Sequence, residues 1–115
     1  MSVVRFSKHD RSIECVSAGD VHAHLYTRKE AHFFPSTPFI VGERKAPQRK
    51  VRLEKATAEP GSVLVVFTDG LKSRTSLKGQ LEVLRRPVIE IAHHLLENDS
   101  RPDDDALVLV ARFLT

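Results

Sequence analysis

Two uninterrupted apolar runs dominate the hydrophobic pattern of the chain, at residues 63–67 (VLVVF) and 106–111 (ALVLVA). A strand-length run without a polar face is typical of a strand that is covered on both sides. Asp69-Gly70 follows the first run, and three consecutive aspartates precede the second. The pattern therefore predicts two buried strands, over 63–67 and 106–114, whose acidic ends meet at one place.

Shorter alternating segments lie between the N-terminus and the first run. Apolar and polar residues alternate over 11–27, with an interruption at Gly19-Asp20. Alternation with a period of two is typical of strands, and a Gly-Asp pair suits a tight turn, so we expect a hairpin here. The segment 32–48 contains three prolines and one glycine, which favour a loop over a central strand. We expect a short irregular connection around 39–41.

One more strand and one helix complete the predicted order. Val51 and Leu53 alternate with charged residues before a Pro-Gly turn. Over 87–98 the pattern changes to that of an amphipathic helix, with a proline in the first turn and Asn98 as the C-terminal cap. The apolar positions of this helix are Val88, Ile91, Ala92, Leu95 and Leu96. The order of elements predicts an α+β fold with a mainly antiparallel β-sheet.

Length and composition fit one ordinary domain, which we assign to residues 1–115. No apolar run approaches the roughly 20 residues that span a bilayer. The N-terminus lacks the apolar stretch and cleavage site of a signal peptide, so we expect a cytoplasmic protein. Cys15 is the only cysteine, which excludes a disulfide within the chain and favours a small buried side chain.

The net charge of +3 comes from 18 basic and 15 acidic residues, which is a modest excess. The densest basic stretch, 42–52, has five lysines and arginines but no aromatic residue on which a base could stack. We interpret it as a solvated loop and strand edge. The alternative is a basic nucleic-acid-binding β domain that contacts phosphates through Arg44–Arg52 and loses affinity steeply with salt.

The histidines and hydroxyl side chains give weaker indications. His22 and His24 share one face of a strand and could bind a transition metal, but no third ligand is visible, and we expect two exposed residues. His93 and His94 are expected on the helix surface. Ser73 and Thr75 follow Asp69, but no residue that could act as a general base stands at a recognisable spacing from them. A nucleophilic serine mechanism therefore has little support.

The acidic strand ends carry the main candidate chemistry. Carboxylates that converge, such as Asp69 with one of 103–105, repel one another and raise a pKa unless a cation joins them. A hard divalent ion such as Mg²⁺ or Mn²⁺ prefers oxygen ligands. The alternative is that Asp-Gly is an ordinary turn and that RPDDDA is a solvated loop.

Four segments, in order, resemble the metal-dependent type-2C (PPM) protein serine/threonine phosphatases. EPGSVLVVFTDGL resembles the family's strand that ends in Ser/Thr-Asp-Gly, and RPDDDALVLVARF resembles its closing Asp-Asp-Ala strand in the form of the bacterial sporulation and stress-response branch. IECVSAGDVHAHLYT and PFIVG resemble that branch's preceding hairpin and loop. The similarity covers most of residues 3–114.

The resemblance implies part of the PPM β-sandwich and a phosphatase that acts in bacterial signalling on a phosphoprotein substrate. It makes Asp69 and Asp104 metal ligands, with Asp105 as a neighbour or alternate ligand, and assigns no further catalytic residue. In the family, two Mn²⁺ or Mg²⁺ ions hold a water that attacks phosphoserine or phosphothreonine.

The sequence departs from the family pattern in one large way and three small ones. The family's N-terminal half supplies a further Asp-Gly strand with a metal-bridging aspartate, which we do not find in this sequence. Smaller departures are Ser62, Asp20 and Leu107. The chain is thus expected either to pair with another half of a phosphatase or to be a non-catalytic relative that binds a regulator of the anti-sigma or anti-sigma-antagonist type. Self-association is expected in both cases, because half a sandwich exposes an apolar sheet face.

Overall fold

The apolar run at 63–67 forms β7 (Val63–Thr68), a central strand of one of two β-sheets. β7 pairs antiparallel with β3 (Val21–Tyr26) on one side and with β8 (Val108–Arg112) on the other. β4 (Ala31–Phe34) adds to β3, so the strand order is β4-β3-β7-β8. The computed structural model describes residues 2–37, 53–72 and 74–114.

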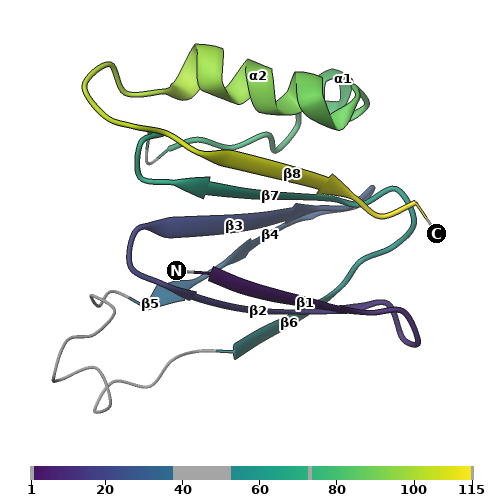
Figure 1. Ribbon diagram of the computed structural model, residues 1–115. Coiled ribbons are helices and arrows are strands. Elements are labelled where there is room, and N and C mark those ends of the chain that lie inside the picture. The colour runs from purple at the N-terminus through teal and green to yellow at the C-terminus, as the bar shows by residue number, and fades with distance from the viewer. Residues whose placement is uncertain (1, 38–52, 73, 115) are drawn as a thin grey trace, which may run out of the picture.

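The second sheet is built around β2 (Ser12–Ala18). β1 (Ser2–Ser7) and β6 (Leu53–Thr57) both pair with it antiparallel, and the short β5 (Ser36–Thr37) runs parallel to its end. Figure 1 shows this sheet below the first one, so the two sheets form a sandwich. The mainly antiparallel α+β fold is confirmed.

Two helices cover the outer face of the β4-β3-β7-β8 sheet, as Figure 1 shows. They are α1 (Leu81–Leu84) and α2 (Val88–Asp99). α2 agrees with the predicted helix and has Pro87 at its N-cap. Asn98 does not cap the helix as expected, because its amide donates to the carbonyl of His94 within the last turn, and the C-cap is Ser100. No helix in the described part of the chain is long and apolar enough to cross a membrane.

β7 separates two hydrophobic cores, which explains why it has no polar face. The core under the helices contains Val63, Val65 and Phe67 from β7 together with Ile91 and Leu95 from α2. The core between the sheets contains Leu64 of β7 with residues of β2 and β3. Its members are Ile13, Cys15, Ala23, Leu25, Phe34, Ala58 and Leu64. The predicted burial of the first apolar run and of Cys15 is therefore confirmed.

β8 is less buried than its sequence predicts. Val108 and Val110 pack partly against the helix-side core, but Leu107 and Leu109 on the other side are 69% and 55% exposed. β8 is an edge strand in the described part of the chain, and the second sheet leaves these two side chains uncovered.

The expected hairpin over 11–27 is wrong, although both of its strands exist. Among the strands that the structure describes, β2 pairs with β1, β5 and β6, and β3 pairs with β4 and β7. The Gly19-Asp20 turn therefore carries the chain from one sheet to the other. The apolar residues of both strands, such as Ile13 and Leu25, face each other across the sandwich instead of side by side in one sheet.

Other segments also differ from the prediction. β4 lies partly in the segment expected to be a loop, where it forms an edge strand that ends before Pro35, and the connection expected at 39–41 lies outside the described residues. In β6 the apolar Leu53 is 62% exposed, because the register places Ala56 beside buried Ile13 and turns Leu53 to the outer face. β1 and α1 were not predicted.

Candidate functional site

The Asp69-Gly70 turn lies directly against the segment that leads into β8. A Cβ atom added to Gly70 would stand 2.0 Å from the backbone oxygen of Asp105 and 2.7 Å from the Cα of Ala106. Such separations are far below van der Waals contact, so only glycine fits at this position. The two acidic segments, remote in sequence, are thus in backbone contact.

Backbone hydrogen bonds on both sides of this contact fix the alignment. The Thr68 amide donates to the carbonyl of Leu107 over 3.1 Å, and the Leu107 amide donates to the Thr68 hydroxyl over 3.0 Å. Beyond the turn, the Arg101 amide donates to the carbonyl of Gly70 over 2.8 Å. The carboxylates of Asp69 and Asp104 therefore belong to two adjoining segments at one end of the sandwich, at the left in Figure 1.

The acidic side chains at this end are exposed and uncommitted. Asp69 and the three aspartates 103–105 are all exposed, and none of them forms an ion pair with a described residue. Exposed carboxylate oxygens without a protein partner are suitable ligands for a hard divalent cation. The donor type and the close approach at Gly70 fit such an ion. The number of ligands is incomplete, because the described residues contain no group of three His, Cys, Asp or Glu side chains that could hold a metal.

A third segment, from the neighbouring strand, adds one more acidic residue to the same end. Val21 is the register partner of Thr68, so Asp20, which precedes Val21, lies at the edge of the sheet where Asp69 follows Thr68. Asp20 is exposed as well. The alternating pattern could have suggested this position only if the pairing of β3 with β7 had been known.

His24 is buried, contrary to the exposed position expected from its sequence. It is 9% exposed and lies 4.2 Å from Phe33 between ring centroids. The neighbouring His22 stacks on Phe67 at 5.1 Å. Both imidazoles lie on the face of the sheet that carries Phe67, and the rings of Tyr26, Phe33 and Phe67 surround His24, an environment that the strand pattern could not reveal.

His24 is held in a buried position by a hydrogen-bond relay. The Leu77 amide donates to the hydroxyl of Tyr26 over 2.9 Å, and that hydroxyl lies 2.9 Å from Nδ1 of His24. The tautomer of the imidazole decides which of the two groups donates in this second contact. Burial, and to a lesser degree His22, lowers the pKa of His24 to about 4. Burial also raises the pKa of Tyr26. The relay ties Leu77 to β3 and occupies Nδ1 of His24.

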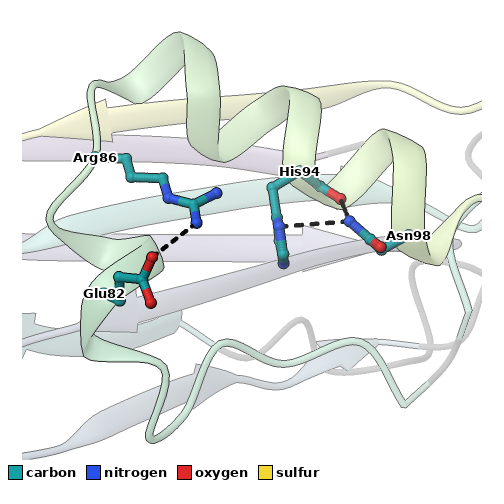
Figure 2. Close-up of polar contacts among 4 residues, drawn as sticks. All are labelled: Glu82, Arg86, His94 and Asn98. Atoms are coloured by element: carbon teal, nitrogen blue, oxygen red, sulfur yellow. Dashed lines mark hydrogen bonds and ion pairs between the residues drawn. The ribbon is translucent and has the colours of Figure 1, made fainter.

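The helix histidines are on the surface, as expected. His93 is exposed, and His94 is half-buried near Asn98, whose amide donates over 2.7 Å to the backbone carbonyl of His94. Figure 2 shows this contact together with the ion pair of 3.1 Å between Glu82 and Arg86. Thr75 is buried, and Ser73 lies outside the described residues.

A β-sandwich with helices on an outer face, and with an Asp-Gly turn packed against an acidic strand start, is the architecture that the sequence motifs predict for PPM phosphatases. The sequence model described as Stage II sporulation protein E (SpoIIE) matches residues 1–114. The chain therefore belongs to the SpoIIE family, and it shares its fold with solved serine/threonine phosphatase domains. No curated protein sequence gives a significant match.

Solved structures share the fold. A chain from work on the bacterial stressosome, described as a modular system adapted to control secondary messenger signalling, has a TM-score of 0.82 and 22% identity over 96% of this chain and 57% of that one. The phosphatase domain of SpoIIE from Bacillus subtilis, presoaked with Mn, has a TM-score of 0.71 and 16% identity over 100% and 56%. The catalytic domain of the serine/threonine phosphatase PstP with two manganese ions has a TM-score of 0.67 and 21% identity over 97% and 57%.

The TM-scores show a common fold. At these low sequence identities, the function has to be argued from the residues of this chain. The chain spans a little over half the length of each of these structures. The expectation that it corresponds to part of a PPM sandwich is therefore confirmed.

Proposed function

We propose that the chain forms part of a metal-dependent protein serine/threonine phosphatase, with Asp69 and Asp104 as ligands of Mn²⁺ or Mg²⁺ and Asp105 as a neighbour or alternate ligand. The observation that carries the proposal is the contact of Gly70 with the backbone of residues 105–106. It holds exposed carboxylates from two remote segments at one end of the sandwich. Divalent cations at such a site supply an activated water and neutralise charge on a phosphoryl group.

The chain's own residues contribute position and charge. The bonds between Thr68 and Leu107 fix the end of β7 against the start of β8, which sets the spacing of the carboxylates. Two carboxylates do not complete a divalent site. In this proposal the remaining ligands come from Asp20, from another part of the same protein or from a second chain.

The proposed substrate is a phosphoserine or phosphothreonine on a protein in bacterial stress or developmental signalling, in the cytoplasm. Support comes from the family match and from structural neighbours described as phosphatases. A regulator of the anti-sigma-antagonist type is the partner that this role implies, and the stressosome neighbour is compatible with it.

Mn²⁺ binding tests the metal assignment directly. Mn²⁺ titrated into ¹⁵N-labelled protein is expected to broaden the amide signals of Gly70 and Ala106 before all others, because its unpaired electrons act over short distances. Asp69→Asn and Asp104→Asn should each remove this selective broadening, and Asp103→Asn, in the same exposed loop, should retain it. Broadening that is unchanged in the Asp69 and Asp104 variants would contradict the assignment.

Activity is the second measurement for this proposal. Hydrolysis of a phosphothreonine peptide by the protein that contains this chain should require Mn²⁺ or Mg²⁺ and should be lost in Asp69→Asn and Asp104→Asn. Selective Mn²⁺ binding without metal-dependent hydrolysis would support Asp69 and Asp104 as metal ligands and would refute the catalytic part of the proposal.

A non-catalytic PPM-like module that binds a regulatory partner is the second candidate. It is favoured by the absence of a three-ligand metal group in residues 2–37, 53–72 and 74–114. This candidate predicts that Asp69→Asn leaves the biological output unchanged. The nucleic-acid alternative depends on Arg44–Arg52, which lie outside the described residues, and it stays a prediction.

A further inference from the structure

A hollow of about 670 Å³ lies at the end of the sandwich opposite the acidic end. It opens between the β3–β4 turn, the start of β7, α1 and the end of β8. These segments lie at the right in Figure 1. Three arginines (Arg28, Arg85 and Arg112) and three apolar residues (Val63, Leu81 and Leu84) line it. The six residues of β7, at about 3.3 Å each, separate it from Asp69 by roughly 20 Å.

Arg112 is held in place by the backbone. Its Nη2 donates to the carbonyls of Leu84 and Arg86 over 2.6 and 2.8 Å, at the end of α1. These two bonds use both protons of Nη2, which leaves the protons of Nε and Nη1 available. Among the described residues those two nitrogens have no hydrogen-bond acceptor. A guanidinium with fixed orientation and free donors is prepared to bind an anion, because little side-chain entropy is lost on binding.

The positive charge in this hollow has no counter-charge. None of Arg28, Arg85 and Arg112 forms an ion pair with a carboxylate in the described part of the chain, and the hollow has no acidic residue in its lining. An adjoining hollow of about 300 Å³ adds Lys29 and Lys78, with Glu30 as its acidic member. Guanidinium groups that converge without a carboxylate are best neutralised by a multivalent anion such as a phosphate, to which they bind with two hydrogen bonds each.

The hollow also has an apolar part. Leu84 and Val63 form its floor with Leu81, whose side chain is exposed although it is large and apolar. A volume of several hundred cubic ångströms with apolar walls and a few polar groups is typical of a small-molecule site. A long nucleic acid or a protein would be expected to use an extended surface instead.

We propose that this hollow binds an organic phosphate, a small molecule that joins a phosphate or pyrophosphate group to an apolar or aromatic body. The arginines bind the phosphate and the leucines contact the body. The site is independent of the acidic end, because no residue is shared between them. It therefore goes beyond the proposed phosphatase function and does not depend on it.

The test uses inorganic pyrophosphate and ATP as probes, with EDTA present so that no divalent ion occupies the acidic end. Both probes should shift the NMR signals of the Gly61 and Leu81 amides and of the Arg112 Nε–H, and should leave the Gly70 amide unchanged. ATP should bind at least about tenfold more tightly than pyrophosphate, because burying its base adds more than about 1.4 kcal/mol.

Exposed arginines provide variants that keep the fold. Arg28→Gln and Arg85→Gln should each weaken ATP binding several-fold, and the double variant should weaken it more than about tenfold. Arg74→Gln is the matched control, since Arg74 is exposed and lies outside the hollow. Its affinity for ATP should equal that of the wild type.

Three results would overturn the proposal. The first is that neither probe shifts the signals of these residues at concentrations up to about 10 mM. The dissociation constant would then be larger than that expected of a formed site. The second is an equal loss in the Arg74 variant, which would indicate unspecific attraction. The third is equal affinity for both probes, or binding only of an acidic peptide or an oligonucleotide, which would refute the small organic ligand.

Discussion

Gly70 is the residue whose missing side chain allows the close approach at the acidic end. Its lack of a side chain lets the turn after β7 touch the backbone of residues 105–106, and this contact brings Asp69 to the loop that carries Asp104. The dipeptide Asp-Gly is common in turns, where glycine serves backbone freedom. At Gly70 the requirement is steric instead, because the backbone of residues 105–106 occupies the position that a Cβ atom would take.

Gly70→Ala is expected to destabilise the fold by about 2 kcal/mol or more, since backbone atoms must move to admit the methyl group. Gly79→Ala is the matched control. A Cβ at Gly79 meets nothing within 4 Å, and only its positive φ of 82° opposes alanine, at a cost of about 1 kcal/mol. Urea unfolding measures both. Equal losses in the two variants would contradict the close contact at Gly70.

His24 makes stability depend on pH. Its pKa in the folded state, about 4, lies below the ordinary value of 6.5, so the unfolded chain takes up a proton first as the pH falls. The His24 contribution to the free energy of unfolding is fully present above about pH 6.5 and is lost between there and pH 4. The loss is expected to reach up to roughly 3 kcal/mol.

Unfolding curves of the wild type and of His24→Gln from pH 7 to pH 4 measure this contribution as a difference in slope. His94→Gln, on the helix surface, should keep the wild-type slope. An NMR titration that places the pKa of His24 near 6.5 would show that burial does not hold the imidazole neutral.

At the level of elements, β8 connects the main features of the molecule. The loop before it carries Asp104, and its last residue, Arg112, reaches the end of α1. Its exposed face carries Leu109, and the exposed Leu107 directly precedes the strand. It is also the outer strand of its sheet in the described residues, so one row of backbone groups is unpaired. An edge strand with exposed leucines favours pairing with another chain or segment.

Self-association through β8 follows from this exposure. The chain alone is expected to form dimers whose population rises with protein concentration, as measured by sedimentation velocity. Leu109→Lys should shift the population to monomer without loss of stability, because Leu109 is already half-exposed. Leu114→Lys, at another exposed leucine outside β8, is the control and should associate like the wild type. A wild-type chain that remains monomeric at all concentrations would exclude this surface as a contact between copies.

At the scale of the whole molecule, the sandwich separates two kinds of charge. The exposed aspartates stand at one end of β7 and the three unpaired arginines at the other. The rigid strands between them keep the proposed cation and phosphate sites apart, so each can be tested without the other. The chain spans a little over half of its structural neighbours, and the activity of the complete protein is therefore a matter for the experiments above.

The sequence by itself determined what depends on local pattern. Local pattern predicted the unbroken apolar run of β7, the 3.6-residue period of α2 and the acidic segments beside two strands. These features could be predicted because the hydrophobic patterns of strands and helices extend over only a few residues. The family motifs indicated the sporulation and stress-response branch, and the match over residues 1–114 confirmed the SpoIIE family.

Only the tertiary structure decided which strands pair and which faces are covered. From the sequence, Gly19-Asp20 could join the strands of a hairpin or connect two sheets. Leu53 could face the core or the solvent, and His24 could be exposed or buried. The alternation of side chains is the same in each case. The contact of Gly70 with residue 105 and the meeting of Arg28, Arg85 and Arg112 depend on segments far apart in the chain. Such contacts arise from packing between elements, which no local pattern encodes.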